Sequence, residues 1–197
     1  MDNTKSIDPL DKMDFMARTF LDLNRWGFQE KGRLKTKFPV IVYQSSWCLM
    51  KFAWGGMEMQ GGYTISVDYG RLHAPIDDIY MKWNGEKCHC WHNVSYALHF
   101  LDGNSPDSIA GKNYKRPYVM EQFMQSDIGV SLKDRRHQPE WLTRMHGAIW
   151  DHYGIRLFEL FDLRKPNLWE QYRQFIKEFY DIEGRSPNIK PPLDSIC

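Results

Sequence analysis

The dipeptide Asn84-Gly85 joins two short β-prone runs, "DIYMKW" and "EKCHCW", and it constrains the fold of this chain more than any other feature. Asn-Gly is the strongest short-range signal for a two-residue β-hairpin turn. Such a turn fixes which residues face each other, and a slip of one position would exchange the two faces. The predicted pairs on one face are Met81 with Cys88 and Ile79 with Cys90, and those on the other are Tyr80 with His89 and Asp78 with Trp91.

Other elements lie on both sides of this hairpin. The runs "FPVIVYQ", "SWCLMKFAW" and "YTISVDYGRLH" precede it and alternate as strands do. Short turns between consecutive strands predict a four- or five-stranded antiparallel meander. An amphipathic helix is predicted before it, over residues 8–26, and the charged "EKGRLKTK" is interpreted as an exposed connection.

Helical patterns follow from Asn93 onward, and the last helix is predicted to be capped by Asn167. A helix, a meander and a group of helices make an α+β fold in which the C-terminal helices cover one face of the sheet. We expect residues 1–197 to form one domain, with a loosely ordered Pro-rich tail over residues 185–197.

Composition narrows the function classes. Lys and Arg number 26 against 25 Asp and Glu, so the balanced charge does not indicate a nucleic-acid partner. The amino end resembles no signal peptide and the apolar runs are too short to span a membrane, which predicts a cytoplasmic protein. The four cysteines are then expected to be reduced thiols.

The two cysteines of the hairpin allow two interpretations. Facing Met81 and Ile79, Cys88 and Cys90 are expected to act as small apolar residues of a buried strand face. The alternative is a zinc-stabilised fold, in which Cys88, Cys90 and His92 share a face and Cys48 approaches from another strand. A single C-x-C lacks the usual zinc ligand spacing, so no cofactor is predicted, with zinc or another divalent metal kept as the alternative.

A polar cluster beside the hairpin is the candidate site. The core-facing row of one strand continues past Tyr69 into Arg71 and His73. The predicted register brings Asp77 opposite His92. Arginine, histidine and carboxylate together can form a general base, an anion clamp or a metal site, although a structural ion-pair cluster has the same composition. The candidate catalytic residues are Arg71, His73, Asp77 and His92, and the candidate binding residues are Asp78, His89, Trp91 and Tyr69.

The chain has no G-x-S-x-G or H-E-x-x-H motif. Trp and Tyr, which are common at interface hot spots, are abundant. The sequence therefore favours a binding or accessory module that engages a protein partner or a second copy of itself. The alternative is a hydrolase or nuclease-like enzyme that uses the polar cluster. The basic "KNYKR" (residues 112–116) is interpreted as a solvated loop, and His146 as a satisfied interior histidine.

Overall fold

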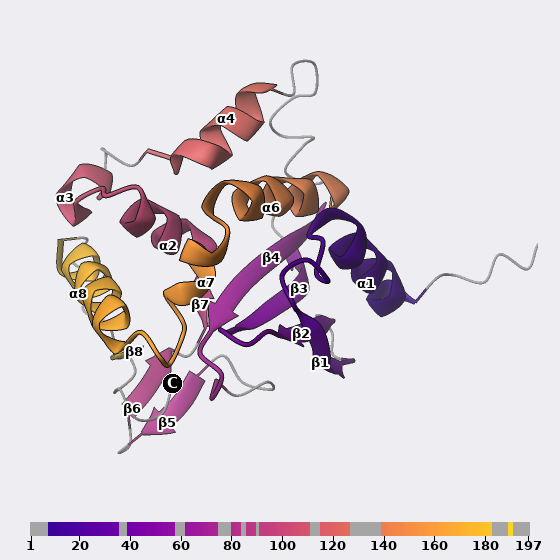
Figure 1. The fold of residues 1–197 in the computed structure, drawn as a ribbon, viewed down its shortest axis with the longest axis horizontal. Helices are drawn as coiled ribbons and strands as arrows, with labels where there is room; N and C mark the ends of the chain where they lie inside the picture. Colours follow the sequence, from indigo (N-terminus) through magenta and orange to yellow (C-terminus); the bar gives the residue numbers. More distant parts are fainter. Residues whose placement is uncertain are drawn as a thin grey trace, which may run out of the picture.

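The structure is a computed structural model that describes residues 8–35, 39–57, 62–74, 80–83, 86–89, 91–110, 115–126, 139–182 and 189–190. A helix comes first, strands follow, and helices occupy most of the second half (Figure 1), which confirms the α+β fold. None of the helices in the described ranges combines the length and apolar character needed to cross a bilayer.

The helices are α1 (Pro9–Phe20), α2 (Val94–Leu101), α3 (Pro106–Ile109), α4 (Tyr118–Ser126), α6 (Pro139–Tyr153), α7 (Ile155–Glu159) and α8 (Pro166–Ile182). The strands are β1 (Gln29–Leu34), β2 (Val40–Gln44), β3 (Leu49–Met57), β4 (Gly62–Gly70), β5 (Tyr80–Trp83), β6 (Glu86–His89), β7 (His92–Asn93) and β8 (Ile189–Lys190).

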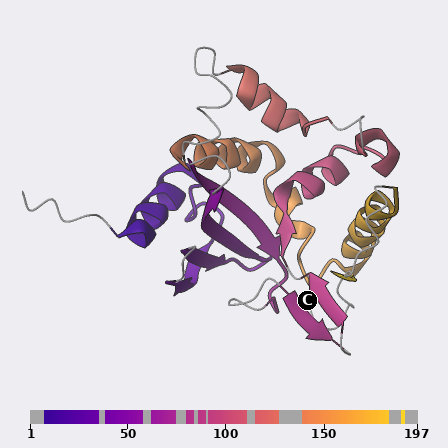
Figure 2. The same ribbon diagram turned by 180° about the vertical axis from the view of Figure 1, so that it is seen from behind.

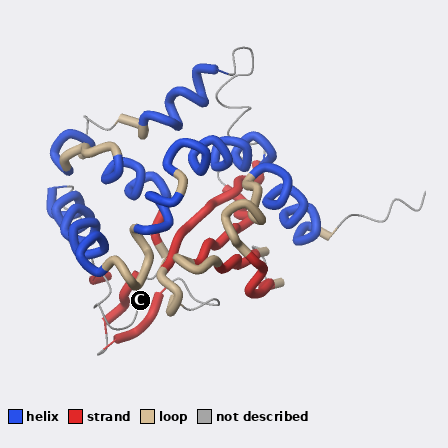
Figure 3. Tube along the Cα trace, viewed as in Figure 1, coloured by secondary structure: helices blue, strands red, loops and turns tan. Residues whose placement is uncertain are grey.

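The main sheet has five strands in the order β1-β2-β3-β4-β7, and each neighbouring pair is antiparallel. Its core-facing row packs with the helices in one apolar cluster and includes Ile41, Tyr43, Met50, Phe52, Val67 and Tyr69. Figures 1 and 3 show the helices on one side of this sheet, and Figure 2 shows the same arrangement from behind. The predicted cover of one sheet face by helices is confirmed.

The first helix is shorter than predicted. The Asp8 side chain accepts a hydrogen bond of 2.9 Å from the Leu10 amide and caps α1, which ends at Phe20 instead of residue 26. Asp22 has a positive φ of 49°, a conformation that cannot continue a right-handed helix. The following turn directs Trp26 into the core, where its ring centroid lies 5.5 Å from that of Phe158.

The prediction of a connection after this helix was wrong, because Gln29–Leu34 forms β1. This strand lies at the sheet edge and pairs only with β2 among the described strands. Charged side chains are common on edge strands, where they discourage pairing with another chain. Arg33 of β1 forms ion pairs with Glu30 at 2.8 Å and with Asp11 of α1 at 3.0 Å, so the charges also tie the edge to the helix.

The hairpin register is as predicted, but the hairpin belongs to a different sheet. Tyr80 pairs with His89 and Met81 with Cys88, which confirms a two-residue connection. The strands β5 and β6 form a second sheet with β8, which runs parallel to β6. The predicted four- or five-stranded antiparallel sheet is confirmed, but the hairpin does not extend it, and Ile189–Lys190 of the predicted loose tail is a strand. The predicted pairs of Ile79 and Asp78 fall outside the described residues.

A glycine follows the end of α6, and a proline is the first residue of α8. Helix α6 ends before Gly154, whose φ of 55° and ψ of −136° form a combination that glycine adopts far more readily than other residues. Helix α8 begins at Pro166, one residue before the predicted cap Asn167.

Gly147 in α6 allows a close approach to α1, because a Cβ placed there would lie 2.3 Å from the Phe20 carbonyl oxygen.

Candidate functional site

Two of the predicted catalytic residues, Arg71 and His92, meet at Trp169 of α8. The Arg71 guanidinium carbon lies 5.1 Å from the Trp169 ring centroid, and the His92 ring lies 5.2 Å from it in an edge-on arrangement. Arg71 follows β4 directly and keeps the core-facing direction of Tyr69, whereas His92 pairs with Tyr69 in β7. The sheet and the last helix thus bring together two residues that are 21 positions apart.

Aromatic rings surround this pair. The His92 ring lies 5.7 Å from the Tyr172 ring and 5.8 Å from the Phe161 ring, and Arg71 is only 5% exposed. The Trp169 indole N–H and the Tyr172 hydroxyl are buried and form no hydrogen bond with any described residue. Burial raises the pKa of the Tyr172 phenol well above its ordinary value. Cation–π and edge-on ring contacts account for this arrangement as packing.

The other predicted site residues divide into two groups. His73 is exposed on the turn after β4, so the prediction that it continues the core-facing row was wrong. The strand ends at Gly70, and the Ala74 amide donates to the Arg71 carbonyl at 2.9 Å, so the alternation stops there. Asp77 and Asp78 fall outside the described residues, as does the side chain of His89.

The predicted binding residues Tyr69 and Trp91 do not share a face. Tyr69 is buried on the helix side, where its hydroxyl accepts a hydrogen bond from the Trp150 indole N–H. Burial raises the pKa of the Tyr69 phenol. Trp91 belongs to a second apolar cluster with Val42 and Leu49, on the opposite face of the sheet. These two side chains therefore cannot contact one ligand together.

The opposite face of the sheet also carries a buried lysine. The Lys51 ammonium lies 4.5 Å from the Trp91 ring centroid and is directly across from Asp68 in the β3–β4 register. Burial raises the pKa of Asp68, and the charge of Lys51 opposes that shift. Opposite charges on facing strand positions stabilise a sheet, so this pair is explained by the fold.

The metal alternative cannot be assembled from the described side chains. Cys48 is buried, with its amide donating to the Ser45 hydroxyl at 3.3 Å, and burial raises its thiol pKa. The side chains of Cys88 and Cys90 fall outside the described residues. Within the described ranges, no three or more His, Cys, Asp or Glu residues are placed to hold a metal ion.

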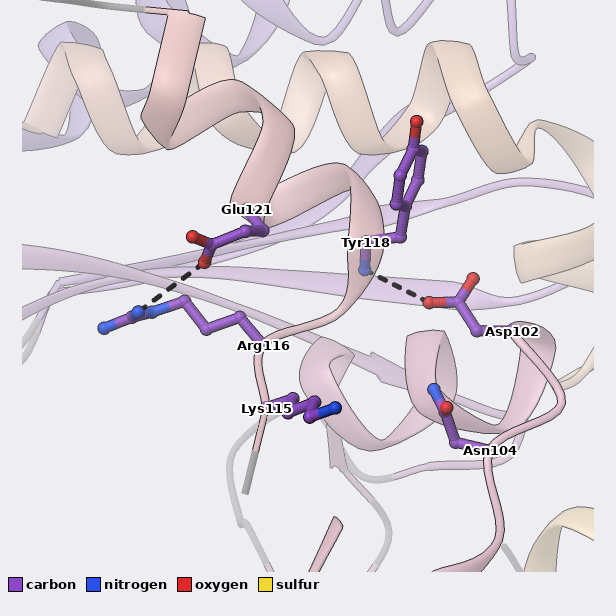
Figure 4. A pocket seen from close by; sticks show the side chains of 6 residues that line it. All are labelled: Asp102, Asn104, Lys115, Arg116, Tyr118 and Glu121. Carbon is purple, nitrogen blue, oxygen red and sulfur yellow. Dashed lines mark hydrogen bonds and ion pairs between the residues drawn. The ribbon is translucent and has the colours of Figure 1, made fainter. Parts of the chain in front are cut away.

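A pocket of about 840 Å³ lies between the loop after α2 and the segment that leads into α4. Its lining comes from both segments and consists of residues whose side chains each carry a polar group: Asp102, Asn104, Lys115, Arg116, Tyr118 and Glu121. Figure 4 shows these side chains around the opening. The size is that of a typical ligand or side-chain pocket.

Asp102 holds one wall of the pocket. Its Oδ1 accepts a hydrogen bond of 2.7 Å from the Tyr153 hydroxyl, and its Oδ2 accepts one of 3.2 Å from the Tyr118 amide. The second bond satisfies one of the free amides at the start of α4. Burial, followed by the hydrogen bond to Asp102, raises the pKa of the Tyr153 phenol. One carboxylate therefore connects the ends of α2 and α6 to the start of α4.

Glu121, the second acidic residue of the pocket, also interacts with polar groups of the chain itself. Glu121 forms an ion pair of 3.7 Å with Arg116 and accepts a hydrogen bond of 3.1 Å from the Gln125 side-chain amide. Lys115 forms no ion pair with any residue in the described ranges. In Figure 4 the Lys115 side chain extends toward Asn104, whereas that of Arg116 points away toward Glu121. Among the described residues, both carboxylates of the pocket therefore have partners and the Lys115 ammonium group has no ion-pair partner.

Asn104 connects the pocket to the interior. Its side-chain nitrogen lies 3.4 Å from Nδ1 of His99, which is fully buried in α2. Burial lowers the pKa of His99, and the nearby charge of Asp102 opposes that shift. The wall that carries Asp102 and Asn104 is thus supported from behind by a neutral histidine and a tyrosine.

Sequence reasoning missed this pocket because its residues are spread over one loop and two helix ends. Residues 112–116 were interpreted as a solvated loop, and no spacing or motif indicates that Asp102 would lie beside Tyr118. Comparison of the chain with protein-family models, curated proteins and solved structures finds no match. The geometry of the described residues therefore carries the functional argument.

Proposed function

We propose that the protein is a binding module that engages a protein partner through the pocket between α2 and α4. The observation that carries the proposal is the hydrogen-bonded wall at Asp102, which fixes the two sides of the pocket relative to each other. A surface that is already arranged loses less conformational entropy when a partner binds. The proposed compartment is the cytoplasm, in line with the free thiol of Cys48.

The residues at the opening support a protein partner. Tyr118 is 59% exposed, and Arg116 stands two residues before it. Tyrosine and arginine are enriched at the energetic centres of protein interfaces, because each offers a large contact area with a polar end. An exposed tyrosine beside a polar pocket is the kind of anchor that such interfaces use.

The hydrolase alternative has weaker support from the described residues. Arg71 and His92 do come together, but against the rings of Trp169 and Tyr172. A general base has to reach a substrate proton within hydrogen-bond distance, which needs an open approach. His73, the remaining described member of the predicted set, is exposed on a turn.

Site-specific photo-crosslinking in an extract of the source cells tests the proposal. A benzophenone amino acid replaces Tyr118 in one full-length protein and Phe15, the 67% exposed aromatic residue of α1, in another. A specific adduct is expected from position 118 and none of the same mass from position 15. An adduct at twice the chain mass of 23.5 kDa would identify the partner as a second copy.

A second pair of variants tests whether the adduct from position 118 depends on the pocket. Asp102→Ala removes the acceptor for Tyr153 and Tyr118 and should abolish the adduct from position 118. Asp107→Ala, at an exposed position of α3, provides the matched control and should leave the adduct unchanged. An adduct that persists in Asp102→Ala, or that forms equally from position 15, would refute the proposal.

A further inference from the structure

The proposed pocket contains more positive than negative charge available to a partner. Asp102 already accepts two hydrogen bonds from the chain, and Glu121 forms an ion pair with Arg116 and accepts a hydrogen bond from Gln125. Lys115 is exposed and forms no ion pair with any described carboxylate. The formal charges of the lining cancel, but within the described part of the chain the two carboxylates have partners and Lys115 forms no ion pair.

Arg116 adds a second, partly available cation. Its ion pair with Glu121 is 3.7 Å long, and both side chains are more than 40% exposed, at 44% and 43%. Exposed pairs of this kind contribute little to stability, so the guanidinium can exchange Glu121 for another carboxylate easily. Arginine can also bind a carboxylate through two parallel hydrogen bonds, which a lysine cannot do.

The remaining polar groups of the pocket also favour a ligand that accepts hydrogen bonds. The Tyr118 hydroxyl is exposed and can donate a hydrogen bond. The side chain of Asn104 lies on the wall that Lys115 faces in Figure 4. The side chains of Lys115, Arg116 and Tyr118 extend in different directions from one short stretch of the chain (Figure 4). An ammonium, a guanidinium and a phenol suit anionic oxygen atoms better than another cation or an apolar group.

We infer that the pocket recognises an acidic segment of the protein partner, with carboxylates bound by Lys115 and Arg116 and the segment packed along Tyr118. This inference rests on the proposed function and specifies the chemistry of the partner. The segment needs at least two carboxylates, because Lys115 and Arg116 extend in different directions from neighbouring positions in the chain. Affinity should fall with rising salt, since both cations are exposed to solvent.

Fluorescence anisotropy with the intact protein tests this inference. The probe is a hexaglutamate peptide with a rhodamine label, and a labelled hexalysine peptide serves as the negative probe. The double variant Lys115→Glu, Arg116→Glu is expected to bind hexaglutamate at least about tenfold more weakly, since it replaces two attractive contacts with repulsive ones. Lys115→Glu alone should give an intermediate loss.

A charge-matched control separates the pocket from the overall charge. Lys31→Glu, at an exposed position of β1, changes the net charge by the same amount as Lys115→Glu. The inference holds if Lys31→Glu binds as the original protein does while Lys115→Glu loses affinity. Equal losses in the two variants, or equal binding of hexalysine, would overturn it.

Inorganic phosphate and the photo-crosslinking result distinguish the remaining outcomes. Phosphate that binds at millimolar concentration while hexaglutamate does not would show an anion site of another class and overturn the acidic-segment inference. If hexaglutamate fails but the adduct at position 118 persists and depends on Asp102, the binding function stands and only the partner chemistry is wrong. Loss of both results would remove the proposed function as well.

Discussion

The hydroxyl of Tyr153 at the end of α6 donates a 2.7 Å hydrogen bond to Asp102 in the loop after α2. We expect Tyr153→Phe to lower the free energy of unfolding by about 0.5–1.5 kcal/mol, the usual net value of one hydrogen bond. Urea denaturation followed by tryptophan fluorescence measures this change. The same substitution should also weaken partner binding, because the pocket wall loses one of its two fixed points.

Tyr118→Phe is the control for this prediction. It removes a phenol hydroxyl of the same kind, but from an exposed residue whose hydroxyl forms no recorded hydrogen bond within the described ranges. Its stability should stay within about 0.5 kcal/mol of the original protein. Equal loss in both variants would mean that the bond between Tyr153 and Asp102 contributes nothing to the fold.

Gly147→Ala is predicted to destabilise the protein even though alanine is the better helix former. A Cβ at position 147 would meet the Phe20 carbonyl oxygen at 2.3 Å, so α1 and α6 would have to move apart. Overpacking of this kind costs about 1–3 kcal/mol, against a gain of about 1 kcal/mol from helix propensity. A lower midpoint of urea denaturation is the expected result.

Gly32→Ala in β1 serves as the comparison, because a Cβ there would meet nothing within 4 Å. It should change the denaturation midpoint little. A Gly147→Ala protein that is as stable as the original, or more stable, would show that the α1–α6 contact tolerates the added methyl group.

The differences between prediction and structure have physical causes. The hairpin register followed from a turn of two residues, which is a local property, and it was correct. Sheet membership depends on distant contacts, and nothing near Asn84-Gly85 indicates that β6 would pair with β8 rather than extend the meander. The charged residues of β1 are similarly typical of an exposed loop, and nothing in the sequence indicates that a charge of α1 pairs with a charge of this edge strand.

The candidate site was predictable only where strand alternation continued. Arg71 keeps the direction set by Tyr69 and is buried as that alternation requires, whereas His73 comes after the strand has ended. The pocket depends on how α2, α4 and α6 pack together, and hydrophobic periodicity within one helix does not specify this. Its polar residues therefore carried no recognisable spacing.

Arg71→Ala is predicted to lower the free energy of unfolding by about 1–3 kcal/mol, through the lost contact with Trp169 and the space left behind. Arg25→Ala is the control, because Arg25 lies 4.6 Å from the Trp26 ring centroid but is exposed. Its loss should stay below about 1 kcal/mol. An Arg71→Ala protein of unchanged stability would contradict a packing role and favour the enzymatic alternative.

His146→Leu should make the protein less sensitive to acid. Burial lowers the pKa of His146 from 6.5 to about 4, and its Nδ1 forms no hydrogen bond with any described residue. Between these two pH values the unfolded chain binds a proton that the folded protein does not, so the original protein loses stability as the pH falls. The difference approaches about 3 kcal/mol at the lower end of this window.

Urea denaturation of both proteins at pH values across this window measures the effect. The stability advantage of His146→Leu over the original protein should grow as the pH falls. Gly32→Ala, which changes no titratable group, should keep the original pH dependence. A constant difference between His146→Leu and the original protein at all pH values would contradict a buried neutral histidine.

The most direct test of the binding account is a titration of the ¹⁵N-labelled full-length protein with unlabelled hexaglutamate, followed by NMR. The account predicts that amide shift changes concentrate at residues 102–104 and 115–121, which line the pocket, and that they disappear in the Lys115→Glu, Arg116→Glu variant. Changes confined to the surroundings of Arg71 and Trp169, or no localised changes at saturating peptide, would contradict it.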